Sequence, residues 1–287
     1  MASNSALFVL LVLIAAWAPF GLGVLLASAS GFPARGFVVA VAALAVAALT
    51  LAGLAGRAAY PPGPSRCPGL EGPDRERWQR LAYRGLGVAG VLAVLLQWVW
   101  RTGDFTIPLA GAGVLGGYFV FAPPLAWQRR GWGEFWGGLA FGLLPVATGF
   151  YLQARHLISE ILLYGVPLSL TAFNLGLAAG LPQPEQQQPP EPPSLAARLG
   201  PVGTGLLYTI VNILIVLSLI INLFFPAAGH RSQPWLWGLI ALAMVNQELV
   251  KRRAYYQEAR IRLLCCLTLA LYLGMCLIFA LGLWSRL

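Results

Sequence analysis

The chain has 287 residues, of which 58% are apolar and only 10% are charged, and its mean hydropathy is +0.72. This composition excludes an ordinary soluble domain with one buried core and indicates a membrane protein that crosses the bilayer several times. The net charge of +9 does not indicate a nucleic-acid partner, because the arginines lie in short loops between apolar runs, where membrane topology accounts for them. The cysteines form no CxxC pair and have no histidine at ligand spacing, so they predict no metal site.

Nine apolar runs have about the length that is needed to cross roughly 30 Å of hydrocarbon. They are residues 6–28, 34–56, 85–100, 107–126, 135–153, 160–181, 202–225, 234–250 and 263–284. We therefore predict an all-α fold with nine transmembrane helices in one bundle, forming a single domain over residues 1–287. Two polar loops interrupt it: 57–84, whose second half can form an interfacial helix, and the Pro/Gln-rich loop 182–200.

The charges of the loops predict the orientation. The loops that follow the even-numbered runs, including 57–84 and 182–200, hold 14 of the 19 Lys and Arg residues. Cytoplasmic loops carry the excess of positive charge, so these loops are predicted to be cytoplasmic. We expect a multi-pass protein of the bacterial cytoplasmic (inner) membrane, with its N-terminus in the cytoplasm and its C-terminus outside.

One stretch joins a buried helix to a compact basic loop: Tyr118 to Glu134 reads YFVFAPPLAWQRRGWGE. A diproline cannot continue the hydrogen-bond ladder of a helix, so it loosens the last turn and holds the basic turn at Arg129 and Arg130 in a fixed place. Two interpretations stay open. The arginines either only set the topology of a cytoplasmic hairpin, or they bind an anionic group.

The same stretch resembles a known family. A tyrosine, a small residue, Pro-Pro and a basic turn ending in Gly-x-Gly-Glu resemble the loop between the fourth and fifth helices of the UbiA superfamily of intramembrane prenyltransferases, especially the menaquinone branch. The following FWGGLAFGLLPVATGFYLQ resembles that branch's glycine-rich fifth helix. The resemblance implies a nine-helix bundle around an apolar chamber for an isoprenoid tail and an aromatic head group. It also implies prenyl transfer from a diphosphate that is held by Mg²⁺ ions on two aspartate-rich motifs.

Neither aspartate-rich motif keeps its carboxylates. Where the family has NDxxDxxxD, this chain reads LAGLAGRAAYPPGPSRCPG, and no carboxylate precedes Glu71. The segment SLAARLG, from Ser194 to Gly200, resembles the tail of the second motif. Counting back from it without gaps, the two family aspartates fall on Gln183 and Gln187.

A gapped alignment instead places the motif's asparagine on Asn174, with Glu185 and Glu191 as the only carboxylates available. A neutral amide offers a weak oxygen ligand where the site needs charged ones, and electrostatic stabilisation is usually the largest catalytic term. We infer that diphosphate chemistry is lost, and we predict no catalytic residue and no metal ligand.

The leading hypothesis is a catalytically silent UbiA-like membrane protein. It would act as an accessory or structural subunit of a larger membrane complex, or as a binder of a quinone, pigment or isoprenoid lipid. Its predicted lipid- or anion-binding residues are Tyr118, Arg129, Arg130 and Glu134. Its expected partners are membrane lipids and other membrane-protein subunits, and no cofactor is predicted beyond such a bound ligand.

The alternative is an active aromatic prenyltransferase whose Mg²⁺ ligands are the atypical carboxylates Glu71, Asp74, Glu185 and Glu191. A third hypothesis, a small-solute transporter, is disfavoured because the apolar runs hold almost no ionisable group.

Overall fold

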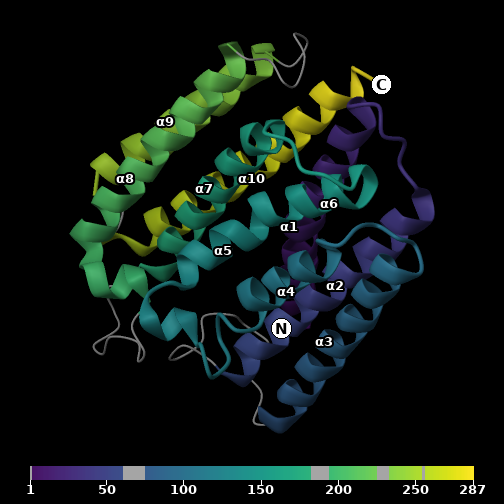
Figure 1. Cartoon of the computed structure of the whole chain (residues 1–287). Helices are drawn as coiled ribbons and strands as arrows, with labels where there is room; N and C mark the ends of the chain where they lie inside the picture. Colours follow the sequence, from purple (N-terminus) through teal and green to yellow (C-terminus); the bar gives the residue numbers. More distant parts are fainter. Residues whose placement is uncertain (1, 61–74, 182–193, 225–232, 254–255) are drawn as a thin grey trace.

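The computed structural model describes residues 2–60, 75–181, 194–224, 233–253 and 256–287, which form a bundle of helices (Figure 1). The helices are α1 (Ala2–Ala29), α2 (Gly36–Ala59), α3 (Arg75–Trp98), α4 (Thr106–Gly117), the 3₁₀ turn η1 (Trp127–Arg130), α5 (Gly133–Phe141), α6 (Leu143–Ala154), α7 (Glu160–Gly180), α8 (Leu195–Phe224), α9 (Gln233–Lys251) and α10 (Glu258–Trp284). The predicted all-α membrane bundle is confirmed.

The predicted number of spanning helices requires a correction. Each of the nine apolar runs has a helical counterpart in the described residues, but only seven helical segments there are long and apolar enough to cross a membrane. The short helix α4 has 12 residues, which span only about 18 Å at the usual rise of an α-helix. The other exception, α9, carries Asn246, Gln247 and Glu248 in its second half, and these side chains lower its hydropathy.

Two predicted boundaries also move. The helix expected to begin at residue 85 begins at Arg75, because RERWQRLAYR consists mostly of good helix formers and continues the helix without a break. The helix expected to reach residue 126 ends at Gly117, well before the diproline, because the chain turns at Tyr118. Residues 61–74 and 182–193 of the two predicted polar loops lie outside the described residues.

Two spans contain a break. The span Gly133–Ala154 is divided into α5 and α6 at Gly142, where a Cβ atom would lie 2.3 Å from the backbone nitrogen of Ser169. The Ser169 hydroxyl accepts a 2.8 Å hydrogen bond from the N–H of Leu143 and so caps the start of α6. The long helix α8 is kinked at Gly200, whose φ of 69° favours glycine, and Pro201 follows it.

Helix α7 is the centre of the bundle, since it packs against α5, α6, α8 and α10. Beside it, α1 and α6 approach closely through two glycines. A Cβ atom on Gly23 would lie 2.1 Å from the carbonyl oxygen of Val146, and one on Gly149 would lie 2.2 Å from that of Phe20. Small residues allow such backbone contact between membrane helices.

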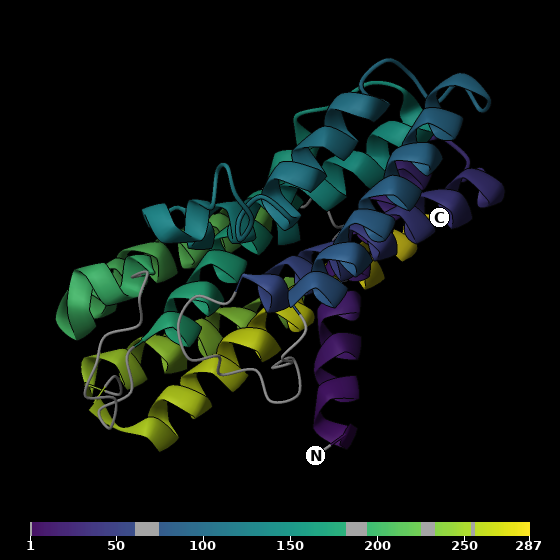
Figure 2. The same cartoon turned by 90° about the horizontal axis from the view of Figure 1, so that it is seen from below.

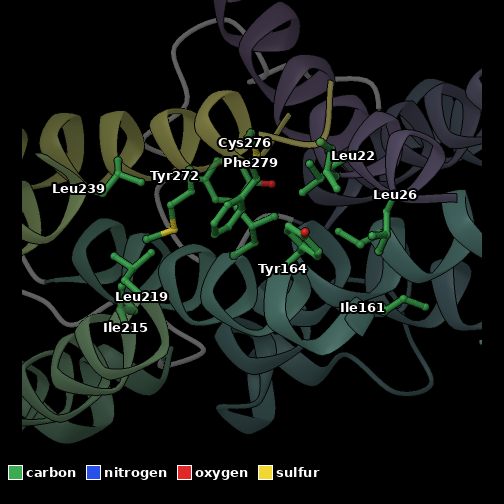
Figure 3. Close-up of a cluster of buried hydrophobic side chains, with 14 of the residues drawn as sticks. Leu22, Leu26, Ile161, Tyr164, Ile215, Leu219, Leu239, Tyr272, Cys276 and Phe279 are labelled. Atoms are coloured by element: carbon green, nitrogen blue, oxygen red, sulfur yellow. The ribbon is translucent and has the colours of Figure 1, made fainter. Parts of the chain in front are cut away.

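The main core lies where α1, α6, α7, α8, α9 and α10 meet, and Figure 3 shows part of it. In it, the ring of Tyr164 meets the ring of Phe279 edge to face at 5.2 Å. The hydroxyl of Tyr272 donates to the backbone carbonyls of Ala15 and Phe141 and thus joins α10 to α1 and α5. These bonds satisfy the Tyr272 hydroxyl where no water is available, whereas the buried hydroxyl of Tyr164 has no partner among the described residues.

The helix ends gather at two opposite ends of the bundle. At the first, which we call the η1 end, η1 lies with the last turns of α2 and α7 and the first turns of α3 and α8. At the second, which we call the Arg35 end, the α1–α2 and α3–α4 links lie beside the end of α6. Figure 2 shows that the N-terminal part of α1 projects away from the other helices.

Candidate functional site

The basic turn at the η1 end is held by its own backbone. The N–H of Gln128 donates to the carbonyl of Val120 at 2.9 Å, so the chain after the diproline folds back on the segment before it. Within the turn, Ala126 has a left-handed backbone with φ of 42°. The turn therefore has a defined conformation, as the sequence predicted for a positioned loop.

The side chains of Arg129 and Arg130 are both exposed on this turn. Arg130 donates a long hydrogen bond of 3.5 Å to the carbonyl of Pro124, and the carbonyl of Arg129 accepts a 2.7 Å bond from the guanidinium of Arg198 at the start of α8. Three arginines thus share one surface at a membrane boundary. Such a surface attracts anionic groups by about 1 kcal/mol for each arginine.

Glu134 is buried, with only 8% of its surface exposed. Its side chain lies against Gly176 and Gly180 of α7, at 3.4 and 3.5 Å from where their Cβ atoms would be. The backbone N–H groups of Leu195 and Ala196 interact with its carboxylate. A carboxylate at a helix N-terminus complements the helix dipole, so Glu134 anchors the start of α8. Its geometry is that of an internal anchor and not of a surface group.

Tyr118 is also buried, with 4% of its surface exposed, but it packs on the other side of the site, against α2 and α3. Its ring occupies the space over Gly56, 2.9 Å from where a Cβ atom would be, and its centroid lies 6.0 Å from that of Tyr83. Nearby, Tyr60 accepts a 2.8 Å hydrogen bond from the amide of Gln79. The four predicted binding residues therefore fall into three environments: an aromatic cluster, an exposed basic turn and a buried anchor.

Asn174 is fully buried on α7, and its Nδ2 donates to the carbonyl of Tyr208 at 3.3 Å. It precedes Gly176 by two residues, which is more than half a helical turn, so it lies on a different face of α7 from the one that meets Glu134. The structure does not bring these two residues together. The other predicted residues of the second motif, Gln183, Glu185 and Gln187, lie outside the described residues.

The described residues at the end of α2 do not fit Mg²⁺. The segment that the sequence resemblance aligns with the family's first aspartates offers Gly56 and Arg57 but no carboxylate among its described residues, and the ring of Tyr118 fills the space above Gly56. The guanidinium of Arg57 instead lies 6.0 Å from the ring centroid of Phe121. Mg²⁺ requires oxygen ligands. This end of the helix is therefore cationic and aromatic in character.

Two contributors to this site were not predicted. Arg198 joins α8 to the basic turn, and it lies within the SLAARLG segment that was considered only as a motif tail. Gly176 and Gly180, which have no side chains, leave room on α7 for the side chain of Glu134. Their spacing of four residues is a known signal for close approach between membrane helices and could have indicated a partner on that face.

Both the sequence and the fold of this chain are similar to known proteins. The model of the UbiA prenyltransferase family matches residues 73–271. The fold is similar to the apo structure of a UbiA homolog from Aeropyrum pernix K1, with a TM-score of 0.65 and 16% sequence identity over 93% of this chain and 97% of that chain. At this identity the likeness establishes the fold alone. Among curated proteins, none matches the chain significantly.

Proposed function

Because this chain belongs to the UbiA prenyltransferase family, we propose that it retains the family's membrane bundle as a non-catalytic binder of an isoprenoid lipid, quinone or pigment. In this role it serves as an accessory subunit of a larger membrane complex. The observation that supports the proposal is the end of α2, where the guanidinium of Arg57 lies beside Phe121, the ring of Tyr118 packs on Gly56, and the described residues offer no carboxylate.

The reasoning is electrostatic. A diphosphate leaves with its negative charge offset by metal ions, and the metal ions need carboxylates to hold them. At the end of α2, the chain offers a cation and two aromatic rings, which suit an anionic or π-electron-rich group in the absence of metal. At the start of α5, the carboxyl group of Glu134 interacts with the N-terminus of α8, while its Oε2 is buried without a hydrogen-bond partner among the described residues. These groups can bind and position a ligand, but they do not supply the charge that ionisation of a diphosphate requires.

The test is an assay in nanodiscs with Mg²⁺, a prenyl diphosphate and an aromatic acceptor, run beside a family member that has both aspartate motifs. We expect transfer by the control and none by this protein, and native mass spectrometry should show an apolar ligand that co-purifies with it. Turnover that disappears in the double variant Glu185→Gln, Glu191→Gln would contradict the proposal and establish the active prenyltransferase instead.

A further inference from the structure

The Arg35 end of the bundle holds a cluster of cationic side chains that the proposed function does not use. Arg35 lies on the link between α1 and α2, and Arg155 follows the last residue of α6. His156 comes next in the chain. The segments that carry these residues join spanning helices, so the cluster lies at the level of the lipid headgroups.

Arg35 is fixed in this cluster by two hydrogen bonds to the end of α6. Its backbone N–H donates to Oε1 of Gln153 at 2.9 Å, and its guanidinium donates to the carbonyl of Leu152 at 2.5 Å. Partial burial and the nearby charge of Arg155 lower the pKa of Arg35. Arg155 follows Leu152 and Gln153, the two partners of Arg35, by three and two residues, so two like charges share this end of α6.

Asp104 on the α3–α4 link and Glu160 at the start of α7 lie at the same end, but within the described part of the chain neither forms an ion pair with Arg35 or Arg155. The two ion pairs found there, Arg252–Glu248 and Arg262–Glu258, belong to the α9–α10 region. The Nε2 of Gln153, a hydrogen-bond donor, is buried and has no partner among the described residues. An anion beside the two arginines would relieve the repulsion and is the natural complement to unpaired donors.

His156 adds a third group with a fixed orientation. Its Nδ1 lies 2.9 Å from the carbonyl oxygen of Ala154, which can only accept, so Nδ1 carries a proton. A phosphate oxygen also only accepts, so Nε2 binds it as the second N–H donor of the imidazolium form. The ring lies 5.1 Å from the centroid of Phe32 and 5.9 Å from that of Phe150. Cations beside aromatic rings at a helix end are typical of a surface that meets a lipid headgroup.

We propose that Arg35, Arg155 and His156 bind the phosphate group of an anionic membrane lipid at this end of the bundle. Arg35 also serves the fold, because it caps α6. The guanidinium of Arg155 makes no hydrogen bond to the described residues and is exposed. Arg155 is therefore the residue whose loss should affect the lipid and leave the protein folded.

The experiment uses the full chain in nanodiscs of phosphatidylcholine, with or without phosphatidylglycerol, and native mass spectrometry to count bound lipids. The variants are Arg155→Gln, Arg155→Lys and the control Arg101→Gln, which removes an exposed positive charge from the α3–α4 link at the same end. We expect the wild type to retain phosphatidylglycerol in preference to phosphatidylcholine, Arg155→Gln to reduce this retention about fivefold, and Arg155→Lys and Arg101→Gln to leave it nearly unchanged.

Equal retention of both lipids by the wild type, or equal losses in Arg155→Gln and Arg101→Gln, would overturn the proposal, because general attraction to the surface would then suffice. Inorganic phosphate added to phosphatidylcholine nanodiscs should not raise the unfolding temperature. A rise would overturn the assignment to a lipid and indicate a soluble phosphate. Should Arg155→Gln fail to fold, His156→Gln takes its place, since this exposed ring can be replaced without opening the core.

Discussion

The guanidinium of Arg198 donates a 2.7 Å hydrogen bond to the backbone carbonyl of Arg129. This contact joins the first turn of α8 to the basic turn. On the buried side, the carboxyl group of Glu134 interacts with backbone N–H groups at the start of the same helix. The backbone of the turn is thereby fixed, and the side chains of Arg129 and Arg130 remain exposed. A cationic surface that is held in this way is prepared to bind without rearrangement, which reduces the ordering cost of binding.

The first prediction tests this surface with the double variant Arg129→Gln, Arg130→Gln. Each arginine contributes about 1 kcal/mol of attraction to an anionic group at a membrane surface, so retention of anionic lipid or of an associated subunit should fall about tenfold or more. The matched control is Arg77→Gln, Arg80→Gln, two exposed arginines on α3 at the same end. Equal losses in both double variants, measured by native mass spectrometry, would mean that the turn acts only through net charge and topology.

The second prediction concerns orientation. In a variant with all four cysteines replaced by serine, single cysteines at the exposed positions Arg130 and Arg155 report the two ends of the bundle. Because the loops with most arginines are predicted to face the cytoplasm, an impermeant maleimide added to intact spheroplasts should label Arg155→Cys and not Arg130→Cys. The reverse pattern would invert the proposed topology.

Much of the fold could be predicted from the sequence, because apolar runs of spanning length are a strong signal. The bounds of α2, α7 and α10 lie within a few residues of the predicted runs. The breaks at Gly142 and Gly200 were not predicted. The break at Gly142 depends on Ser169, a residue that only the folded bundle brings into contact. The short α4 was missed because the apolar residues after Gly117 continue the hydropathy pattern without continuing the helix.

The candidate site could be predicted less well. The position of the basic turn followed from its prolines and glycines, which act locally. The burial of Glu134 could not be read from its neighbours in the sequence, since it depends on Gly176, Gly180 and the start of α8. A charged residue beside a polar loop is usually solvated, and only the packing of three distant segments makes this one internal. The binding roles of Arg129 and Arg130 stay predictions.

The third prediction concerns Glu134. Glu134→Gln replaces one oxygen of the carboxyl group that faces the N-terminus of α8 with an amide donor, which should destabilise its first turn by roughly 1 kcal/mol. Hydrogen exchange at the amides of Leu195 and Ala196 should then be about fivefold faster. The control is Glu160→Gln at the exposed first turn of α7, which should leave these amides unchanged. Unchanged exchange in Glu134→Gln itself would show that the anchor is dispensable.

The fourth prediction concerns the contact between α1 and α6. Gly23→Ala and Gly149→Ala each place a methyl group against a backbone carbonyl of the facing helix, at 2.1 and 2.2 Å. Both should lower the free energy of unfolding by about 1–3 kcal/mol, the usual cost of overpacking. Gly21→Ala meets nothing within 4 Å, and it should be neutral or stabilise the protein by about 0.5–1 kcal/mol through helix propensity. Thermal unfolding of the three purified variants tests this prediction. A large loss of stability in Gly21→Ala would contradict the proposal that α1 meets α6 through Gly23 and Gly149 and not through Gly21.

The last prediction compares two buried asparagines on facing helices. The Nδ2 of Asn212 on α8 donates to the carbonyl of Ala243 at 2.9 Å and to Oε1 of Gln247 at 3.2 Å. Asn246 on α9 is fully buried, yet neither its Oδ1 nor its Nδ2 has a partner among the described residues. Hydrogen bonds between membrane helices contribute about 0.6–2 kcal/mol, whereas a buried polar group without a partner costs roughly 1–3 kcal/mol.

Replacement by leucine, which is similar in size, should therefore act in opposite directions at these two positions. Asn212→Leu should lower the unfolding temperature, because it leaves Oε1 of Gln247 without the donor Nδ2 and removes the hydrogen bond to the carbonyl of Ala243. Asn246→Leu should leave the temperature unchanged or raise it. The measurement is the unfolding temperature of both variants and of the wild type in the same detergent. If Asn246→Leu destabilises the protein as much as Asn212→Leu does, the amide of Asn246 has a partner after all, and a water or ligand bound between α8, α9 and α10 becomes the first candidate to examine.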